Sequence, residues 1–154
     1  MSGRVQHIHL VPTAEAAPTP VNSVRAEAGL GLEGDRYHAQ MGSFSGDGRS
    51  GREVTLIASE AIEALEAEFG VKLAPGQSRR NITTFGIDLN GFVDKELRVG
   101  DVVMRGTRLC EPCQGLEDYI GQPNVIKGLV HRGGLRCEIV SGGMIRVGDQ
   151  ITPA

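Results

Sequence analysis

The sequence contains no tryptophan, and aromatic residues make up only 4% of its 154 positions. A hydrophobic core must therefore be built mainly from Val, Ile, Leu and Ala, and the hydrophobic fraction of 40% is large enough to fill one. No apolar run approaches the length needed to cross a membrane. We therefore expect a single domain over residues 1–154, without membrane association.

An excess of positive charge is also missing. The net charge of −3 argues against general binding of nucleic acids. The three cysteines are an odd number, and no apolar signal segment follows Met1, so we expect a reducing, cytoplasmic setting. The Gly/Ser-rich segment Gly42–Gly51 lacks the Gly-Lys-Ser/Thr ending of a nucleotide phosphate loop, which argues against ATP or GTP binding.

What is abundant is glycine, with 22 residues that separate short apolar runs, as is typical of a turn-rich β protein. One amphipathic helix is clear over Glu60–Phe69, with Ser59 placed to cap its start and Gly70 placed to end it. One or two short helices are expected between Gln114 and Val130, with an interruption at Gly121–Pro123.

The apolar runs predict a mainly β domain, a closed or nearly closed barrel with the amphipathic helix packed on its outside. Gly142-Gly143 is expected to form a tight hairpin connection between the last two predicted strands. The predicted strands are Val5–Val11, Val21–Ala26, Arg52–Ala58, Asn81–Phe85, Glu96–Val99, Val102–Leu109, Leu135–Val140 and Met144–Val147.

The tetrapeptide Cys110-Glu111-Pro112-Cys113 is the segment most indicative of chemistry, and three interpretations compete. A thioredoxin-type dithiol would need a surrounding βαβ unit, which we do not expect here. A structural zinc site would need a second closely spaced ligand pair, which is missing among the candidate ligands Cys110, Cys113, Cys137 and His131 or His38. The third interpretation is a single functional thiolate at the end of a strand.

Cys113 is the preferred thiolate. A thiolate can act as a nucleophile, carry a persulfide sulfur or bind a soft metal ion. Pro112 stiffens the turn before it and would hold the sulfur in a fixed direction. Cys137 lies within an apolar strand and is interpreted as buried and inert, and Cys110 as an accessory to Cys113.

Four motifs, in this order, resemble those of the MOSC domain, the C-terminal domain type of the molybdenum cofactor sulfurases. They are Gly31–His38, Arg80–Leu89, Leu97–Asp101 and Cys110–Cys113, and the closing segment His131–Arg136 resembles that of compact stand-alone members. The resemblance covers nearly the whole chain. It implies a mostly β, barrel-like fold that binds the molybdenum cofactor, a molybdopterin-type pterin with molybdenum, and it implies that Cys113 is the molybdenum ligand or a sulfur carrier.

A pterin with a phosphate tail needs cationic groups, N–H donors and a soft anchor for the metal. We predict two groups of cofactor-binding residues, namely Arg80, Asn81, Thr83 and Thr84, and then Lys127, Arg132 and Gly133. His131 is the predicted acid–base residue beside Cys113. Arg80, Lys127 and Arg132 are expected to converge in one pocket, and Asp35-Arg36 is expected to form an internal ion pair.

Two reactions agree with these expectations. Cys113 could transfer sulfur from a sulfur donor, or the protein could reduce an N-oxygenated small molecule, as relatives that act on N-hydroxylated bases and amidoximes do. Reduction would require an external electron donor, because the sequence has no flavin, nicotinamide or iron–sulfur motif. The alternatives are a non-catalytic carrier or insertion protein for the cofactor and a zinc-stabilised binding module.

Overall fold

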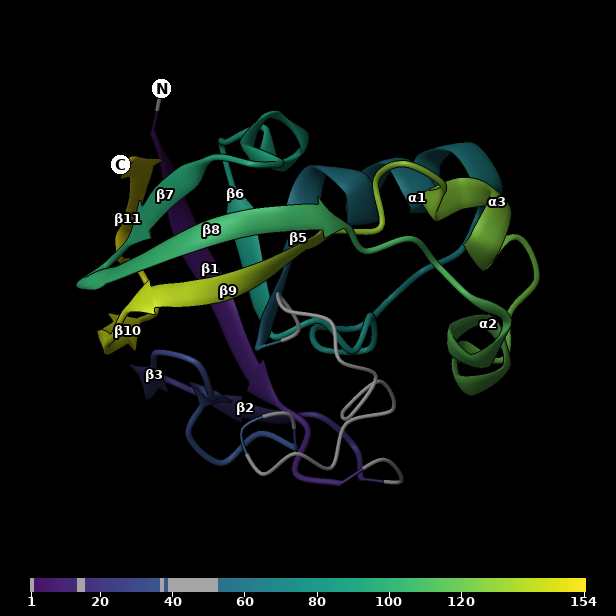
Figure 1. Cartoon of the computed structure of the whole chain (residues 1–154). Helices are drawn as coiled ribbons and strands as arrows, with labels where there is room; N and C mark the ends of the chain where they lie inside the picture. Colours follow the sequence, from purple (N-terminus) through teal and green to yellow (C-terminus); the bar gives the residue numbers. More distant parts are fainter. Residues whose placement is uncertain (1, 14–15, 37, 39–52) are drawn as a thin grey trace.

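The computed structural model describes residues 2–13, 16–36, 38 and 53–154 of the chain (Figure 1). The Gly42–Gly51 segment and Arg52, the predicted first residue of a strand, lie outside the described residues. No helix in the described part of the chain is long and apolar enough to cross a membrane.

Seven of the described strands form a closed barrel. They are β1 (Gly3–Leu10), β5 (Val54–Ala58), β6 (Ile82–Phe85), β7 (Glu96–Val99), β8 (Val102–Leu109), β9 (Leu135–Ser141) and β11 (Gln150–Pro153). Their order is β11-β7-β8-β9-β5-β6-β1, and antiparallel pairing of β11 with β1 closes the ring. The prediction of a mainly β barrel is confirmed.

Short strands extend this barrel. β2 (Thr19–Val21) pairs with the second half of β1, while β3 (Ser23–Glu27), β4 (Gly31–Leu32) and β10 (Gly143–Arg146) form a separate three-stranded sheet. The predicted Gly142-Gly143 hairpin is wrong, because β9 pairs with β5 and β8 whereas β10 pairs with β3. Gly142 instead permits a close backbone approach, since a Cβ there would lie 2.6 Å from the carbonyl oxygen of Ala26.

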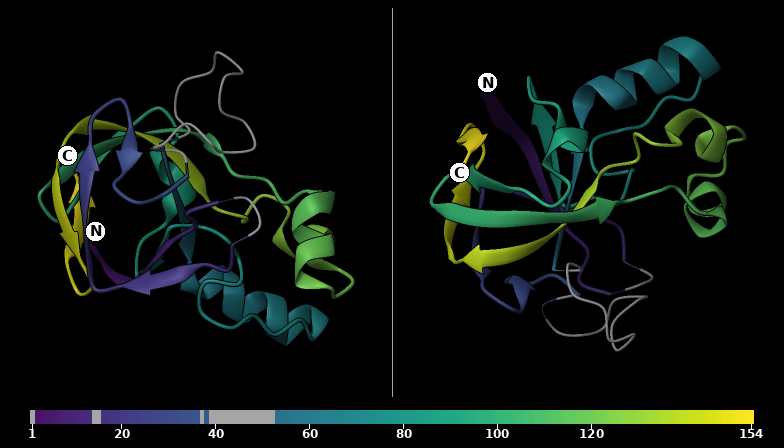
Figure 2. Two further views of the ribbon diagram at one scale, coloured as in Figure 1. Left: turned by 90° about the horizontal axis from the view of Figure 1, so that it is seen from below. Right: turned by 45° about the horizontal axis from the view of Figure 1, so that its top comes forward.

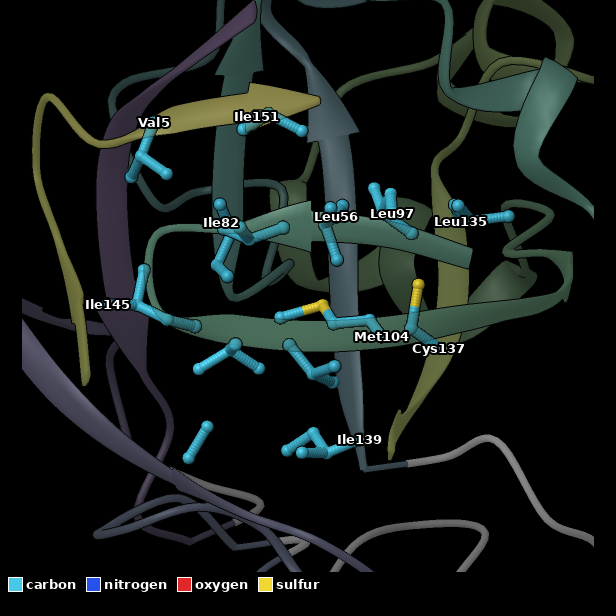
Figure 3. Packing of buried hydrophobic residues seen from close by; sticks show 14 of the residues in the cluster. Val5, Leu56, Ile82, Leu97, Met104, Leu135, Cys137, Ile139, Ile145 and Ile151 are labelled. Carbon is cyan, nitrogen blue, oxygen red and sulfur yellow. The ribbon is translucent and has the colours of Figure 1, made fainter. Parts of the chain in front are cut away.

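Aliphatic side chains fill the barrel interior. Val5, Leu56, Ile82, Met104 and Ile145 point inward and are at most 2% exposed (Figure 3). Burial alternates along β8, as expected for a strand whose two faces meet the core and the outside. Burial of aliphatic side chains therefore supplies most of the barrel core, and Phe92 is the one aromatic residue in this described cluster.

The predicted amphipathic helix is α1 (Ser59–Phe69), and it lies outside the barrel with its apolar face buried and its glutamates exposed. It ends as predicted at Gly70, whose φ of 70° is left-handed. The predicted cap is wrong. Ala58 occupies the cap position, and the hydroxyl of Ser59 contacts Glu60 instead. The helix connects β5 to β6, which run parallel, a pairing that the sequence did not predict.

A second hydrophobic cluster lies between α1 and two short helices, α2 (Gln114–Ile120) and α3 (Val125–Leu129). These are the short helices predicted from the sequence, and Gly121 ends α2 with a φ of 75°. The helices gather on one side of the barrel, where β8 ends and β9 begins (Figures 1 and 2). This cluster therefore fixes α2, and with it the turn that contains Cys113, beside the barrel.

Candidate functional site

A cavity of about 410 Å³ lies where the end of β8 meets the start of α2. Its walls come from segments far apart in the sequence, namely the end of β1, the Asp35-Arg36 turn, the residues before β6, β9 and the Cys110–Cys113 turn. The volume lies within the range that small-molecule and cofactor sites usually have.

Cys113 stands on the wall of this cavity as the residue before the first turn of α2. It is exposed, and its carbonyl oxygen accepts hydrogen bonds from the backbone N–H groups of Leu116 and Glu117. Cys110 lines the same cavity but is only 1% exposed, and its N–H donates to the carbonyl of Gly134 at 2.7 Å. Cys113 is therefore the more accessible of the two sulfur-bearing residues in the wall.

Cys137 lies elsewhere, inside the barrel with the aliphatic core (Figure 3). Burial, and secondarily the nearby carboxylates of Glu53 and Glu138, raise the pKa of its thiol well above the ordinary value. Its predicted burial is confirmed. The described residues contain no group of three or more His, Cys, Asp or Glu side chains that could hold a metal ion.

Arginines dominate the charge of the cavity wall. Arg36, Arg79, Arg80 and Arg136 line it, against two carboxylates, those of Asp35 and Glu111. The guanidinium of Arg79 also lies 4.5 Å from the centre of the Tyr119 ring, which stands on the same wall. A cavity of this charge favours an anionic ligand.

Arg80 braces two parts of the wall. Its Nε donates to the carbonyl of Gly133 at 2.8 Å, and its Nη2 donates to the carbonyl of Cys110 at 3.2 Å. Gly133 itself is buried, and a Cβ there would lie 2.5 Å from the oxygen of Cys110 and 3.1 Å from Cδ of Pro112. The lack of a side chain at Gly133 thus allows close packing against the Cys110–Cys113 turn rather than the predicted approach of a cofactor.

Asn81 lines the cavity, but its amide is occupied by other protein groups. Its Oδ1 accepts from both the N–H and the hydroxyl of Thr55, and its Nδ2 donates to the carbonyl of His9 and to Oδ1 of Asp35. Asp35, 2% exposed, also accepts a hydrogen bond from the N–H of Val11 at 2.9 Å. Asn81 therefore holds the wall of the cavity together, and its contact with a cofactor stays a prediction.

Other predicted cofactor-binding residues lie away from this cavity. Thr83 and Thr84 are buried in β6, and Lys127 lies exposed on α3. Arg132 lines a different cavity and forms an ion pair with Glu68 at 3.1 Å. The predicted convergence of Arg80, Lys127 and Arg132 is therefore wrong, because the side chain of Arg132 turns toward Glu68 on α1 and Lys127 does not line the cavity.

His131 lies at the edge of the site. Its Nδ1 is 2.8 Å from Oε2 of Glu111, and its backbone N–H donates to Oε1 of the same carboxylate. Glu111 lines the cavity, while the side chain of His131 is 77% exposed. The two residues thus connect the wall that contains Cys113 to the solvent.

Arg36, Arg79 and Arg136 line the cavity but were not among the cofactor-binding residues predicted from the sequence. Arg136 could have been found from strand alternation, because its neighbours Leu135 and Cys137 point into the barrel and it must point out. Arg79 adopts a φ of 61°, a backbone conformation that the sequence does not indicate.

Comparisons with known proteins agree on the fold. The family model of the MOSC domain matches residues 34–152. The crystal structure of the YuaD protein from Bacillus subtilis is similar with a TM-score of 0.82 and 16% identity, over 98% of this chain and 94% of that one. That of YiiM from Geobacillus stearothermophilus is similar with a TM-score of 0.75 and 15% identity, over 99% of this chain and 75% of that one. No curated protein sequence matches the chain.

Proposed function

Because the chain belongs to the MOSC domain family, we propose that the cavity beside Cys113 binds the molybdenum cofactor. The observation that carries this proposal is the presence of one exposed cysteine and four arginines on a single cavity wall. In the proposal, Sγ of Cys113 is the ligand of molybdenum or the acceptor of a sulfur atom.

The donor set fits such a group. A thiolate is a soft ligand suited to a metal that already has sulfur ligands, and guanidinium groups bind phosphate with paired hydrogen bonds. Leu116 and Tyr119 add apolar surface of the kind that a planar pterin ring requires. When bound, the cofactor would supply two-electron redox chemistry, while the residues of this chain would hold and orient it.

For the reaction we favour reduction of an N-oxygenated small molecule. Converting a hydroxylamine to an amine consumes two electrons and two protons, breaks the N–O bond and releases water. An external donor would provide the electrons. His131 at the edge of the cavity is a protonatable group open to solvent, which supports a reaction that takes up protons.

Sulfur transfer is the second candidate, favoured by the exposure of Cys113. A donor persulfide could reach this thiolate from solvent and pass its outer sulfur to Sγ of Cys113, with the S–S bond of the donor broken and the donor leaving as a thiolate. The proposed setting is cytoplasmic, where thiols stay reduced.

The test is to purify the protein from a host that synthesises the cofactor and to measure molybdenum, zinc and extractable pterin per chain. We expect molybdenum and pterin in equal amounts in the wild type, with molybdenum lost in Cys113→Ser and retained in the matched thiol control Cys110→Ser. Zinc without pterin would contradict the proposal and favour the zinc-stabilised module.

The same preparations separate an enzyme from a carrier. A chemical electron donor and an N-hydroxylated base are added to the loaded protein, and formation of the amine is followed. Turnover that is lost in Cys113→Ser supports the reductase. A loaded protein that performs neither this reduction nor transfer of sulfur from Cys113 would be a carrier or insertion protein.

A further inference from the structure

His9 is a buried histidine that the proposed function does not use. It lies on β1 and is only 4% exposed. Asn81 holds its backbone on both sides, accepting from the N–H of His9 at 2.7 Å and donating from Nδ2 to its carbonyl at 3.2 Å. Nδ1 of the ring is buried and has no hydrogen-bond partner in the structure as described. The ring is therefore fixed in place without a polar contact at that nitrogen.

The ring of His9 lies directly against Gly76. A Cβ on Gly76 would lie 2.5 Å from Cδ2 and 2.7 Å from Nε2 of the ring, so there is no room for a side chain between them. Gly76 also has a φ of 83°, which side-chain-bearing residues rarely adopt. The backbone of this turn thus rests on the flat surface of the imidazole.

The same turn presents arginines to the cavity. The N–H of Arg79 donates to the carbonyl of Gly76 at 2.9 Å, and Arg79 and Arg80 line the same cavity as Cys113. The guanidinium of Arg79 is held further by the carbonyl of Ala16 at 3.0 Å. Any displacement of Gly76 from the His9 ring would therefore move Arg79.

The surroundings of His9 disfavour a positive charge. Burial, and secondarily the neighbouring His7 with its ring centroid 6.0 Å away, lower the pKa of His9. The strands beside it, β2 and β6, contain no charged residue, and the turn above it carries Arg79 and Arg80. The amide of Asn81 links the carboxylate of Asp35 to the backbone carbonyl of His9.

A protonated ring carries N–H donors at both nitrogens, and the described structure offers no acceptor at Nδ1. A protonated ring must gain a partner or contact with solvent, and Gly76 lies across one side of it. We propose that neutral His9 positions the Gly76–Arg80 turn, and that its protonation displaces the turn and weakens anion binding in the Cys113 cavity. This rests on the proposed function only in that the cavity takes an anionic ligand.

The first experiment follows the turn without a ligand. Nuclear magnetic resonance is used to record the ring resonances of His9 and the backbone amides of Gly76 and Arg79 as the pH is lowered. We expect both amides to shift with the same midpoint as the ring, and not to shift in His9→Phe, which keeps a flat neutral ring. His7→Asn, the matched control, should move the midpoint to higher pH. Amides that stay constant while the wild-type ring titrates would overturn the proposal.

The second experiment measures anion binding with sulfate, which keeps its charge throughout this pH range. Calorimetry should show affinity in the wild type that falls severalfold as the His9 ring becomes protonated, but not in His9→Phe. His9→Asn serves as a second neutral variant if the phenylalanine is not accommodated. A parallel loss of affinity in the variants would overturn the proposal. If the wild type binds no sulfate at any pH, the anion site itself is wrong, and the amide shifts alone decide the role of His9.

Discussion

Nε of Arg80 donates a 2.8 Å hydrogen bond to the carbonyl of Gly133, across 53 positions of the sequence. Together with the bond from Nη2 to Cys110, this contact joins the residues before β6 to the end of β8 and the start of β9. The guanidinium is therefore part of the frame of the cavity as well as part of its charge. These two contacts predict that a change of charge at Arg80 lowers the stability of the fold as well as the affinity for an anion.

Replacing Arg80 with Gln should lower the free energy of unfolding by about 1.5–3 kcal/mol, because two backbone carbonyls lose a charged donor. Urea denaturation measures this as a lower midpoint with an unchanged slope. Arg98→Gln is the matched control, since Arg98 is exposed on β7 outside the cavity. Equal midpoints for the two variants would show that the two hydrogen bonds of Arg80 contribute nothing to stability.

Asn81→Ala should cost more, about 2–5 kcal/mol, because it leaves several buried groups without partners at once. The groups that lose a partner include the carboxylate of Asp35 and the backbone N–H of Thr55. Asn90→Ala is the control, as the side chain of Asn90 donates to His131 at an exposed position. Thermal and urea unfolding of the two variants would compare their losses of stability. A loss at Asn81 no larger than that at Asn90 would contradict the role of Asn81 in holding the wall together.

The sequence predicted the barrel because alternation and glycine placement are local signals. Helix α1, β7 and β8 were located within a residue or two from apolar spacing and turn residues alone. β2, β4 and β11 were missed because two to four residues carry too little periodicity. The predicted hairpin at Gly142-Gly143 was wrong because the residues of a turn do not indicate that the strand after it pairs with a distant strand, here β10 with β3.

The candidate site was also predicted only in part. Cys113 was found from its turn, and the motif residues Asp35, Arg80 and Asn81 do line its cavity. What the sequence could not give is which polar atoms the protein uses internally. The amide of Asn81 is fully occupied by Thr55, His9 and Asp35, and Arg132 turns toward Glu68 on α1.

The thiols provide a direct test of accessibility. Pulsed alkylation of the folded protein, read by mass spectrometry, should label Cys113 first, because it is exposed while Cys110 is 1% and Cys137 0% exposed. Cys137 should react only after unfolding, since burial both excludes the reagent and raises the pKa of its thiol. Labelling in urea, where all three sites open, is the control. Faster labelling of Cys137 than of Cys113 in the folded state would show that Cys113 is not the accessible thiol.

The pH dependence of stability should report on His9. Because its pKa in the folded state is lowered from 6.5, the folded protein binds fewer protons than the unfolded chain as the pH falls. Its contribution to stability is therefore complete above the unfolded pKa and is lost as the pH drops through the folded one. Each unit of depression corresponds to about 1.4 kcal/mol.

Carboxylates titrate in the same range, so the informative quantity is the difference between wild type and His9→Gln. The wild type should lose more of its free energy of unfolding than His9→Gln between about pH 7.5 and 5. His7→Gln should lie between the two, because it removes the repulsion from His7 but leaves the burial of His9 unchanged. Urea denaturation at several pH values gives all three curves. If the curves of wild type and His9→Gln run parallel, His9 is as readily protonated in the folded protein as in the unfolded chain, and its burial carries no electrostatic cost.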